Sequence, residues 1–152
     1  MDETLKQTLE NIYKYHCFMM ADTGKAPPMV FIFKDSMPFP IYINEEVEMG
    51  IGQYISCAID IAKQNSADGI AMVYEQQVGS EKYSDEKIKN ILEGVTSITE
   101  SENKKEHLVL SYTESNGKTH MLMGEIEKDD GGVRFVKNQK WTDSAYNNII
   151  IL

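Results

Sequence analysis

Apolar residues recur at three- and four-residue steps over residues 3–20, which predicts an amphipathic helix. The positions that form its apolar side are Leu5, Leu9, Ile12, Tyr13, His16 and Met20. Asp22-Thr23-Gly24 and the following Pro27-Pro28 are expected to end this helix.

Two short, continuous apolar runs, Met29–Phe33 and Ile70–Tyr74, are typical of strands covered on both faces. Between them the pattern predicts a turn at Met37–Pro40, a short strand at Ile41–Ile43, and a helix from Asn44, its N-cap, to Asn65. The short strand, the helix and the run Ile70–Tyr74 form a strand–helix–strand unit of about 35 residues. That length favours a parallel strand pair joined by a right-handed crossover.

The second half predicts a short helix over Ser84–Gly94, a polar loop over 95–105, and then strands. Asn116-Gly117 lies between two strand-like runs, Leu108–Tyr112 and Thr119–Ile126, and predicts a two-residue type I′ hairpin.

In the register of that hairpin, Tyr112 faces Met121 and Leu110 faces Met123. The same register places His107 and His120 on one face of the sheet. A turn at Asp129–Gly132 then leads into a last strand over Val133–Val136. The sequence therefore predicts one α+β domain over residues 1–152. Its sheet is expected to be mixed, with the strand–helix–strand unit first, a C-terminal antiparallel meander last, and the helices packed on the sheet.

Charge narrows the range of partners. The chain has 24 acidic and 15 basic residues, a net charge of −9, and a single arginine, Arg134. We expect no binding to nucleic acid or to anionic membranes, since both need clustered positive charge. A basic protein partner fits this charge.

Cellular location and redox state follow from simple features. No run approaches the roughly 18–20 apolar residues of a membrane-spanning helix, and Met1-Asp2-Glu3-Thr4 is unlike a secretory signal. Cys17 and Cys57 are too few for a disulfide framework. We expect a cytoplasmic protein with reduced cysteines.

Candidate chemistry is sparse. The three histidines, His16, His107 and His120, lack zinc-ligand spacing, and His16 is expected in the core. Gly50-Ile51-Gly52 is not followed by the lysine of a phosphate-binding loop and favours a late-starting helix. We therefore expect no metal and no cofactor.

Three short segments carry a resemblance. Their kind and order resemble those of the strands in a loosely defined group of small uncharacterised bacterial and phage-borne α/β proteins. The segments are Met29–Phe33, Ile70–Glu75 and Glu106–Leu110. The likeness runs from residue 29 to about residue 141. It lends no function, and implies only that Glu75, at a strand end, is a residue to test.

The first functional hypothesis is a non-catalytic protein-binding or regulatory module. The apolar C-terminal segment needs cover from its own domain or from a second subunit, as in a homodimer. The candidate interface residues are Trp141, Tyr146, Ile149, Ile150 and Ile151. A narrower version is a mobile-element accessory protein that blocks a basic host protein.

The alternative hypothesis is a small metal-dependent hydrolase or nuclease that uses carboxylates around Glu75. Strand ends in α/β sheets commonly present functional groups. This hypothesis requires Glu75, Asp68 and at least one further carboxylate or histidine to converge within about 5 Å, close enough to perturb one another's pKa.

Overall fold

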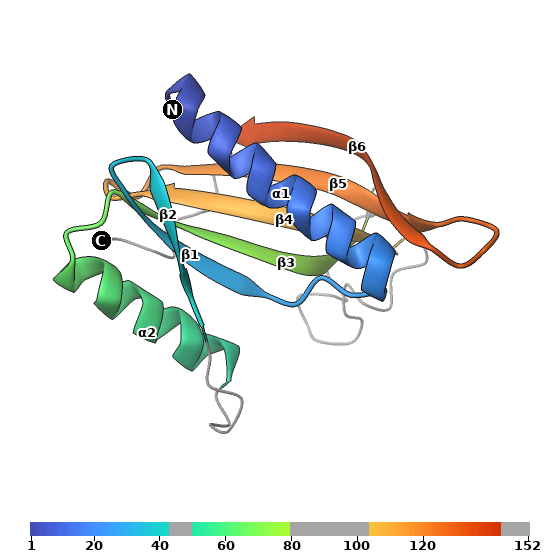
Figure 1. Cartoon of the computed structure of the whole chain (residues 1–152), viewed down its shortest axis with the longest axis horizontal. Helices are drawn as coiled ribbons and strands as arrows, with labels where there is room; N and C mark the ends of the chain where they lie inside the picture. Colours follow the sequence, from blue (N-terminus) through green and yellow to red (C-terminus); the bar gives the residue numbers. More distant parts are fainter. Residues whose placement is uncertain (43–49, 80–103, 144–152) are drawn as a thin grey trace, which may run out of the picture.

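The structure is a computed structural model that describes residues 1–42, 50–79 and 104–143. Its elements, in chain order, are α1 (Glu3–Thr23), β1 (Met29–Lys34), β2 (Met37–Ile41), α2 (Ile51–Gln64), β3 (Gly69–Gly79), β4 (Lys104–Glu114), β5 (Thr119–Lys128) and β6 (Arg134–Asp143). The strands form one sheet in the order β2-β1-β3-β4-β5-β6 (Figure 1). The fold class is α+β, as predicted. Within the described ranges, neither helix combines the length and apolarity that crossing a membrane requires.

The first helix follows the predicted pattern closely. Asp2 caps its N-terminus, since its carboxylate accepts a hydrogen bond from the Leu5 N–H at 2.7 Å. Gly24 ends the helix in the left-handed conformation, with φ of 82°. The buried residues of α1 are Leu5, Leu9, Tyr13, His16 and Met20, all on the predicted apolar side.

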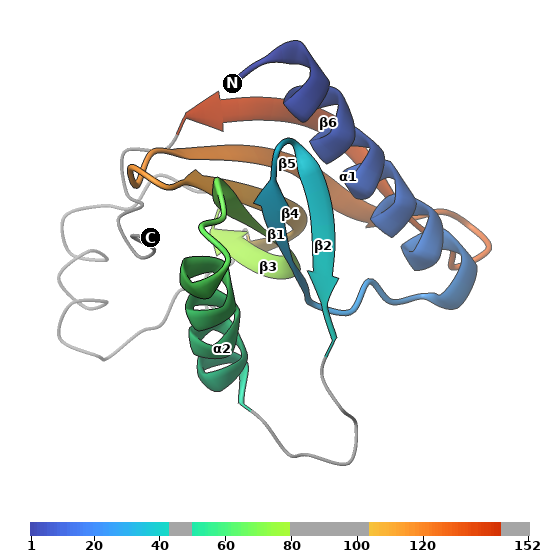
Figure 2. The ribbon, with the colours of Figure 1, turned by 60° about the vertical axis from the view of Figure 1, so that its left-hand side comes forward.

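The sheet separates two apolar cores, and Figure 2 shows it lying between the two helices. On one face α1 packs against alternate strand residues that include Phe33, Val73, Leu108 and Leu110. On the other face Tyr54, Ala58 and Ala62 of α2 pack against Val30, Ile32 and Ile70. This two-sided cover explains why Met29–Phe33 and Ile70–Tyr74 are continuous apolar runs.

The predicted mixed sheet is wrong, because every strand pairing is antiparallel, β1 with β3 included. The physical reason is the β1–β2 hairpin, which reverses the chain before α2 begins. The crossover through α2 therefore joins β2 to β3, which run in the same direction on either side of β1. The strand–helix–strand unit and the C-terminal meander are both present.

The hairpin between β1 and β2 turns earlier than predicted. Asp35 and Ser36 form the turn, with φ of 51° and 61°, and the predicted turn segment is strand β2 itself. The residues that flank such a two-residue turn are hydrogen-bonded to each other, so the nitrogens of Pro38 and Pro40 face away from β1. An edge strand tolerates proline in that position because no ladder hydrogen bond is lost.

The hairpin between β4 and β5 has a three-residue loop, Ser115 to Gly117, in which Gly117 has φ of 91°. The extra residue shifts the predicted register by one, so that Leu110 pairs with Leu122 and Tyr112 with His120. A one-residue shift moves side chains to the other face. Met121 and Met123 consequently lie on the face opposite Tyr112, against the prediction.

The second helix begins at Ile51, with Gly50 as its N-cap, which fits a late start at Gly50-Ile51-Gly52. Asn65 ends it at the predicted place. The predicted cap Asn44 and the predicted helix over Ser84–Gly94 lie outside the described residues.

Candidate functional site

Glu75 is not isolated in solvent, because it forms an ion pair with Arg134. Nη1 of Arg134 lies 2.8 Å from Oε1 of Glu75, and Nη2 lies 3.4 Å from Oε2. Nη2 also donates to Oε2 of Glu106 at 2.8 Å, and Nη1 donates to the backbone carbonyl of Gly24 at 3.0 Å. We call Arg134, Glu75 and Glu106 the arginine cluster.

The fold brings the arginine cluster together at one end of the sheet. Glu75 lies on β3, Glu106 on β4 and Arg134 at the start of β6, and all three are on the face covered by α1. The carbonyl of Gly24, the residue that ends α1, is a further acceptor for the guanidinium. Arg134 thereby ties α1 and three strands to one another.

Arg134 keeps its positive charge although its side chain is largely buried. Burial of the Arg134 side chain, which is 14% exposed, would by itself lower its pKa, but the hydrogen bonds and charges of Glu75 and Glu106 outweigh burial and raise it. A shallow depression of about 630 Å³ lies beside the cluster, lined by Glu75, Glu106, Lys128, Arg134 and residues 24–28. Both terminal nitrogens of Arg134 are already occupied, so the arrangement is suited to holding elements together rather than to binding an anion.

The prediction that Glu75 ends its strand is wrong, because β3 continues to Gly79, and Asp68 lies just before the first residue of that strand. At about 3.3 Å per residue, the separation of seven positions between Asp68 and Glu75 corresponds to about 23 Å. Asp68 instead organises the turns at its own end, where its Oδ2 accepts the Asp35 N–H at 2.7 Å and its carbonyl accepts the Ser115 N–H at 2.9 Å. The predicted convergence of Glu75 with Asp68 is therefore wrong.

The alternative hypothesis of a metal site finds no support in this geometry. Among the residues that the structure describes, no group of three His, Cys, Asp or Glu side chains could hold a metal ion. The carboxylate that does approach Glu75 is Glu106, and an arginine lies between the two.

The histidines occupy three separate environments. His16 is fully buried in the core under α1. His120 lies on the α1 face beside Tyr112 and pairs with Glu114 at 3.2 Å, whereas His107 is on the other face. The prediction that His107 and His120 share a face is wrong, because it assumed a two-residue hairpin loop and therefore a register that differs by one residue from the observed one.

Of the predicted interface residues, only Trp141 lies in the described part of the chain. Its indole Nε1 donates to Oε1 of Glu10 at 3.0 Å, and its ring packs at the edge of the α1 core. This hydrogen bond joins α1 to β6, and a role of Trp141 in an interface stays a prediction. Tyr146, Ile149, Ile150 and Ile151 lie outside the described residues.

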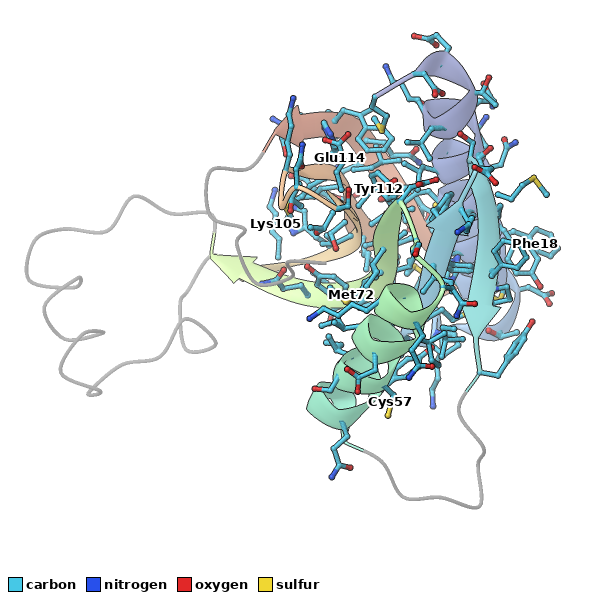
Figure 3. All side chains as sticks on the ribbon, turned by 90° about the vertical axis from the view of Figure 1, so that its left-hand side faces the viewer. Phe18, Cys57, Met72, Lys105, Tyr112 and Glu114 are labelled. Atoms are coloured by element: carbon cyan, nitrogen blue, oxygen red, sulfur yellow. The ribbon has the colours of Figure 1, made fainter. Side chains whose placement is uncertain are left out.

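A feature that the sequence reasoning missed is an exposed apolar surface around strand β2. Its members keep between 50% and 79% of their area in solvent: Tyr15, Phe18, Met37, Phe39 and Tyr42. Tyr15 and Phe18 are neighbours one turn apart on α1, which contacts β2. Figure 3 shows Phe18 pointing outward beside β2. We call these five residues the β2-edge surface.

The β2-edge surface has members on both sides of the sheet. Met37 and Phe39 pair with Lys34 and Ile32 and so lie on the α2 face, whereas Tyr15 and Phe18 lie on the α1 side. One signal was visible in the sequence, since Tyr15 and Phe18 are aromatic residues off the apolar side of the first helix. The other signal was hidden, because Met37–Pro40 was assigned to a turn.

The backbone of β2 is blocked against a further strand. The N–H groups that would point outward belong to positions 38 and 40, where proline has none. A partner at this edge must therefore use side-chain contacts rather than strand addition.

The arginine cluster allows a stability prediction. We expect Arg134→Met to lower the free energy of unfolding by about 1–3 kcal/mol, because Glu75, Glu106 and the Gly24 carbonyl lose charge-assisted hydrogen bonds. Urea denaturation measures the change. Lys137→Met is the matched control: its ion pair with Glu127 is solvent-exposed, so no measurable change is expected. Equal effects of the two variants would show that the cluster has no special structural role.

Comparison with known proteins gives no relative from which to infer a role, so the resemblance seen in residues 29–141 stays a prediction. No protein-family model, curated protein or solved structure matches this chain.

Proposed function

We propose that this chain is a non-catalytic, cytoplasmic protein-binding module that docks its partner through the β2-edge surface. The observation that carries the proposal is that five large apolar side chains on β2, directly after it and on the helix that contacts it are at least half-exposed. Exposed apolar patches of this kind are typical of interaction sites, and aromatic and methionine side chains are enriched in protein interfaces.

The chemistry of the surface limits the kind of partner. Pro38 and Pro40 prevent strand addition, so the partner presents apolar side chains that pack on Phe18, Phe39 and their neighbours. The contact is of the side-chain type, with aromatic anchors supplying most of the binding energy.

We further propose that the partner is basic. Of the net charge of −9, residues 43–49 contribute −3 and residues 80–103 contribute another −3, and the first of these segments directly follows Tyr42 in the chain. Acidic residues near an apolar contact speed the approach of a cationic protein and make binding weaker at high salt. The same proposal has two narrower versions. In one the partner is a second copy of this chain, and in the other this chain is a mobile-element product that blocks a basic host protein.

The test compares surface variants as baits in extracts of the source cell. We expect the double variant Phe18→Ser/Phe39→Ser to lose the partner that the wild type captures, or to bind it at least tenfold more weakly. The reason is that truncating an aromatic anchor of an interface commonly costs about 2 kcal/mol of binding free energy or more. Phe135→Ser is the matched control, since Phe135 is 39% exposed but lies on β6, at the far edge of the sheet. Equal capture by all three baits, or no specific capture by the wild type, would contradict the proposal.

A further inference from the structure

His16 is a buried imidazole with one nitrogen unsatisfied. The side chain is fully buried in the middle of α1, and its ring makes edge-on contacts with Tyr15 at 6.1 Å and Phe31 at 6.2 Å. Nδ1 lies 2.9 Å from the carbonyl of Ile12, so Nδ1 carries the proton and donates it. Within the described ranges, Nε2 is the only buried side-chain nitrogen or oxygen that lacks a hydrogen-bond partner.

In the part of the chain that the structure describes, the surroundings of His16 offer no counter-charge. Its ionisable neighbours on α1 are Tyr13, Tyr15 and Cys17, and burial raises the pKa of Tyr13 and brings that of Cys17 to about 11, so both stay neutral. Strand β1 contributes Phe31, and β2 presents Pro38 and Pro40 toward this side. Burial lowers the pKa of His16, against the weaker opposing effect of the Ile12 hydrogen bond, and no charged side chain of the described residues contributes.

We propose that His16 is an acid-sensitive latch: a proton on Nε2 weakens the seating of α1 on the sheet and thereby alters the β2-edge surface. The link to binding rests on the proposed function, because Tyr15 and Phe18 are the part of that surface carried by α1. The latch itself rests only on the packing of His16.

The physical basis is the difference between the closed and open positions of α1. A protonated Nε2 needs an acceptor. No group of the described residues accepts from it in the packed site, whereas an opened helix exposes the ring to solvent. Because the pKa of His16 is lower when α1 is packed, the open form binds more protons as the pH falls below about 6.5, the value for a free imidazole. Acid then increases the open population by up to tenfold per pH unit, until the packed form also titrates.

Amide hydrogen exchange on the full chain tests the latch. We would measure protection at pH 7.5, 6.5 and 5.5, corrected for intrinsic exchange rates, in peptides covering the second half of α1. Protection there is expected to fall by up to tenfold per pH unit below 6.5. Helix α2, on the other face of the sheet, is the internal control and should keep its protection.

Variants assign the effect to His16. His16→Gln and His16→Leu cannot take up the proton and should each remove the acid-dependent loss in α1, so either one suffices if the other does not fold. His107→Gln, on the opposite sheet face, should retain the loss. An equal fall in α1 and α2, or an acid effect that persists without His16, would overturn the proposal.

A binding comparison separates the two proposals. Partner capture at pH 7.5 and at pH 5.5 should be weaker in acid for the wild type but not for the His16 variants. If exchange shows the latch while capture is unaffected by pH and by Phe18→Ser/Phe39→Ser, the latch stands and the docking surface is wrong. If capture depends on Phe18 and Phe39 but hydrogen exchange in α1 shows no acid effect, the docking surface stands and the latch is wrong.

Discussion

Phe33→Ala is expected to lower the free energy of unfolding by about 3–5 kcal/mol, the range for removing a buried aromatic side chain. Phe33 is completely buried under α1, and its ring packs edge-on against Tyr112 with 5.3 Å between centroids. The neighbouring strands and α1 hold this site from all sides, so the cavity left by the ring cannot collapse fully. Urea denaturation with a shared m-value measures the loss.

The matched control is Phe39→Ala, on the adjacent strand. Phe39 is half-exposed and belongs to the β2-edge surface, so its removal should change stability by less than about 1 kcal/mol. The contrast also bears on function, because a large aromatic residue that the fold does not need is available to a partner. Comparable losses for the two variants would mean that β2 is part of the core and that its surface is not free for docking.

Gly69→Ala is expected to lower the free energy of unfolding by about 3 kcal/mol through overpacking. A Cβ at this position would lie 2.5 Å from Cζ of Tyr112 and 2.7 Å from the carbonyl oxygen of Thr113. Tyr112 is itself buried and the Thr113 oxygen is backbone in the paired strand, so neither can give way cheaply.

Gly52→Ala is the control for Gly69→Ala. No atom lies within 4 Å of a Cβ built at Gly52, and the residue is in the first turn of α2, where alanine is a better helix former. Stability should rise by up to about 1 kcal/mol. The same substitution should therefore have opposite signs at two glycines, and a small effect at Gly69 would contradict the close strand packing described for β3 and β4.

Local signals in the sequence were sufficient for most of the elements. The three- and four-residue spacing from Leu5 to Met20 predicted α1 and its buried side, and the runs at Met29–Phe33 and Ile70–Tyr74 predicted β1 and β3. These signals depend only on residues near one another in the chain. They arise because a helix must bury one side, and a strand inside a covered sheet must bury both faces.

Strand direction and register were not predictable in the same way. One residue in the Ser115–Gly117 loop decided which side chains of β5 face α1, and the turn at Asp35-Ser36 decided whether β1 and β3 run parallel. Small changes in turn geometry have consequences across a whole sheet, and composition carries little information about them.

The candidate site was predictable only in part. Glu75 was predicted at a strand end, but it lies inside β3, which continues to Gly79. Its partner Arg134 is 59 positions away in the chain, and no periodic pattern connects the two residues. The pairing follows from the sheet order, which places β3, β4 and β6 under the same helix end. The β2-edge surface was missed for a similar reason, since it combines two segments that only the fold brings together.

Photo-crosslinking from the β2-edge surface shows whether a partner binds there in the cell. A photoreactive phenylalanine analogue would replace Phe18, and Phe135 in the control, and the source cells would be irradiated before denaturing electrophoresis. We expect a discrete adduct from position 18 and none from position 135. Its mass should be twice that of the chain if the partner is a second copy, and another mass if it is a different protein. No adduct from position 18, or equal adducts from both positions, would show that the β2-edge surface is not the docking site.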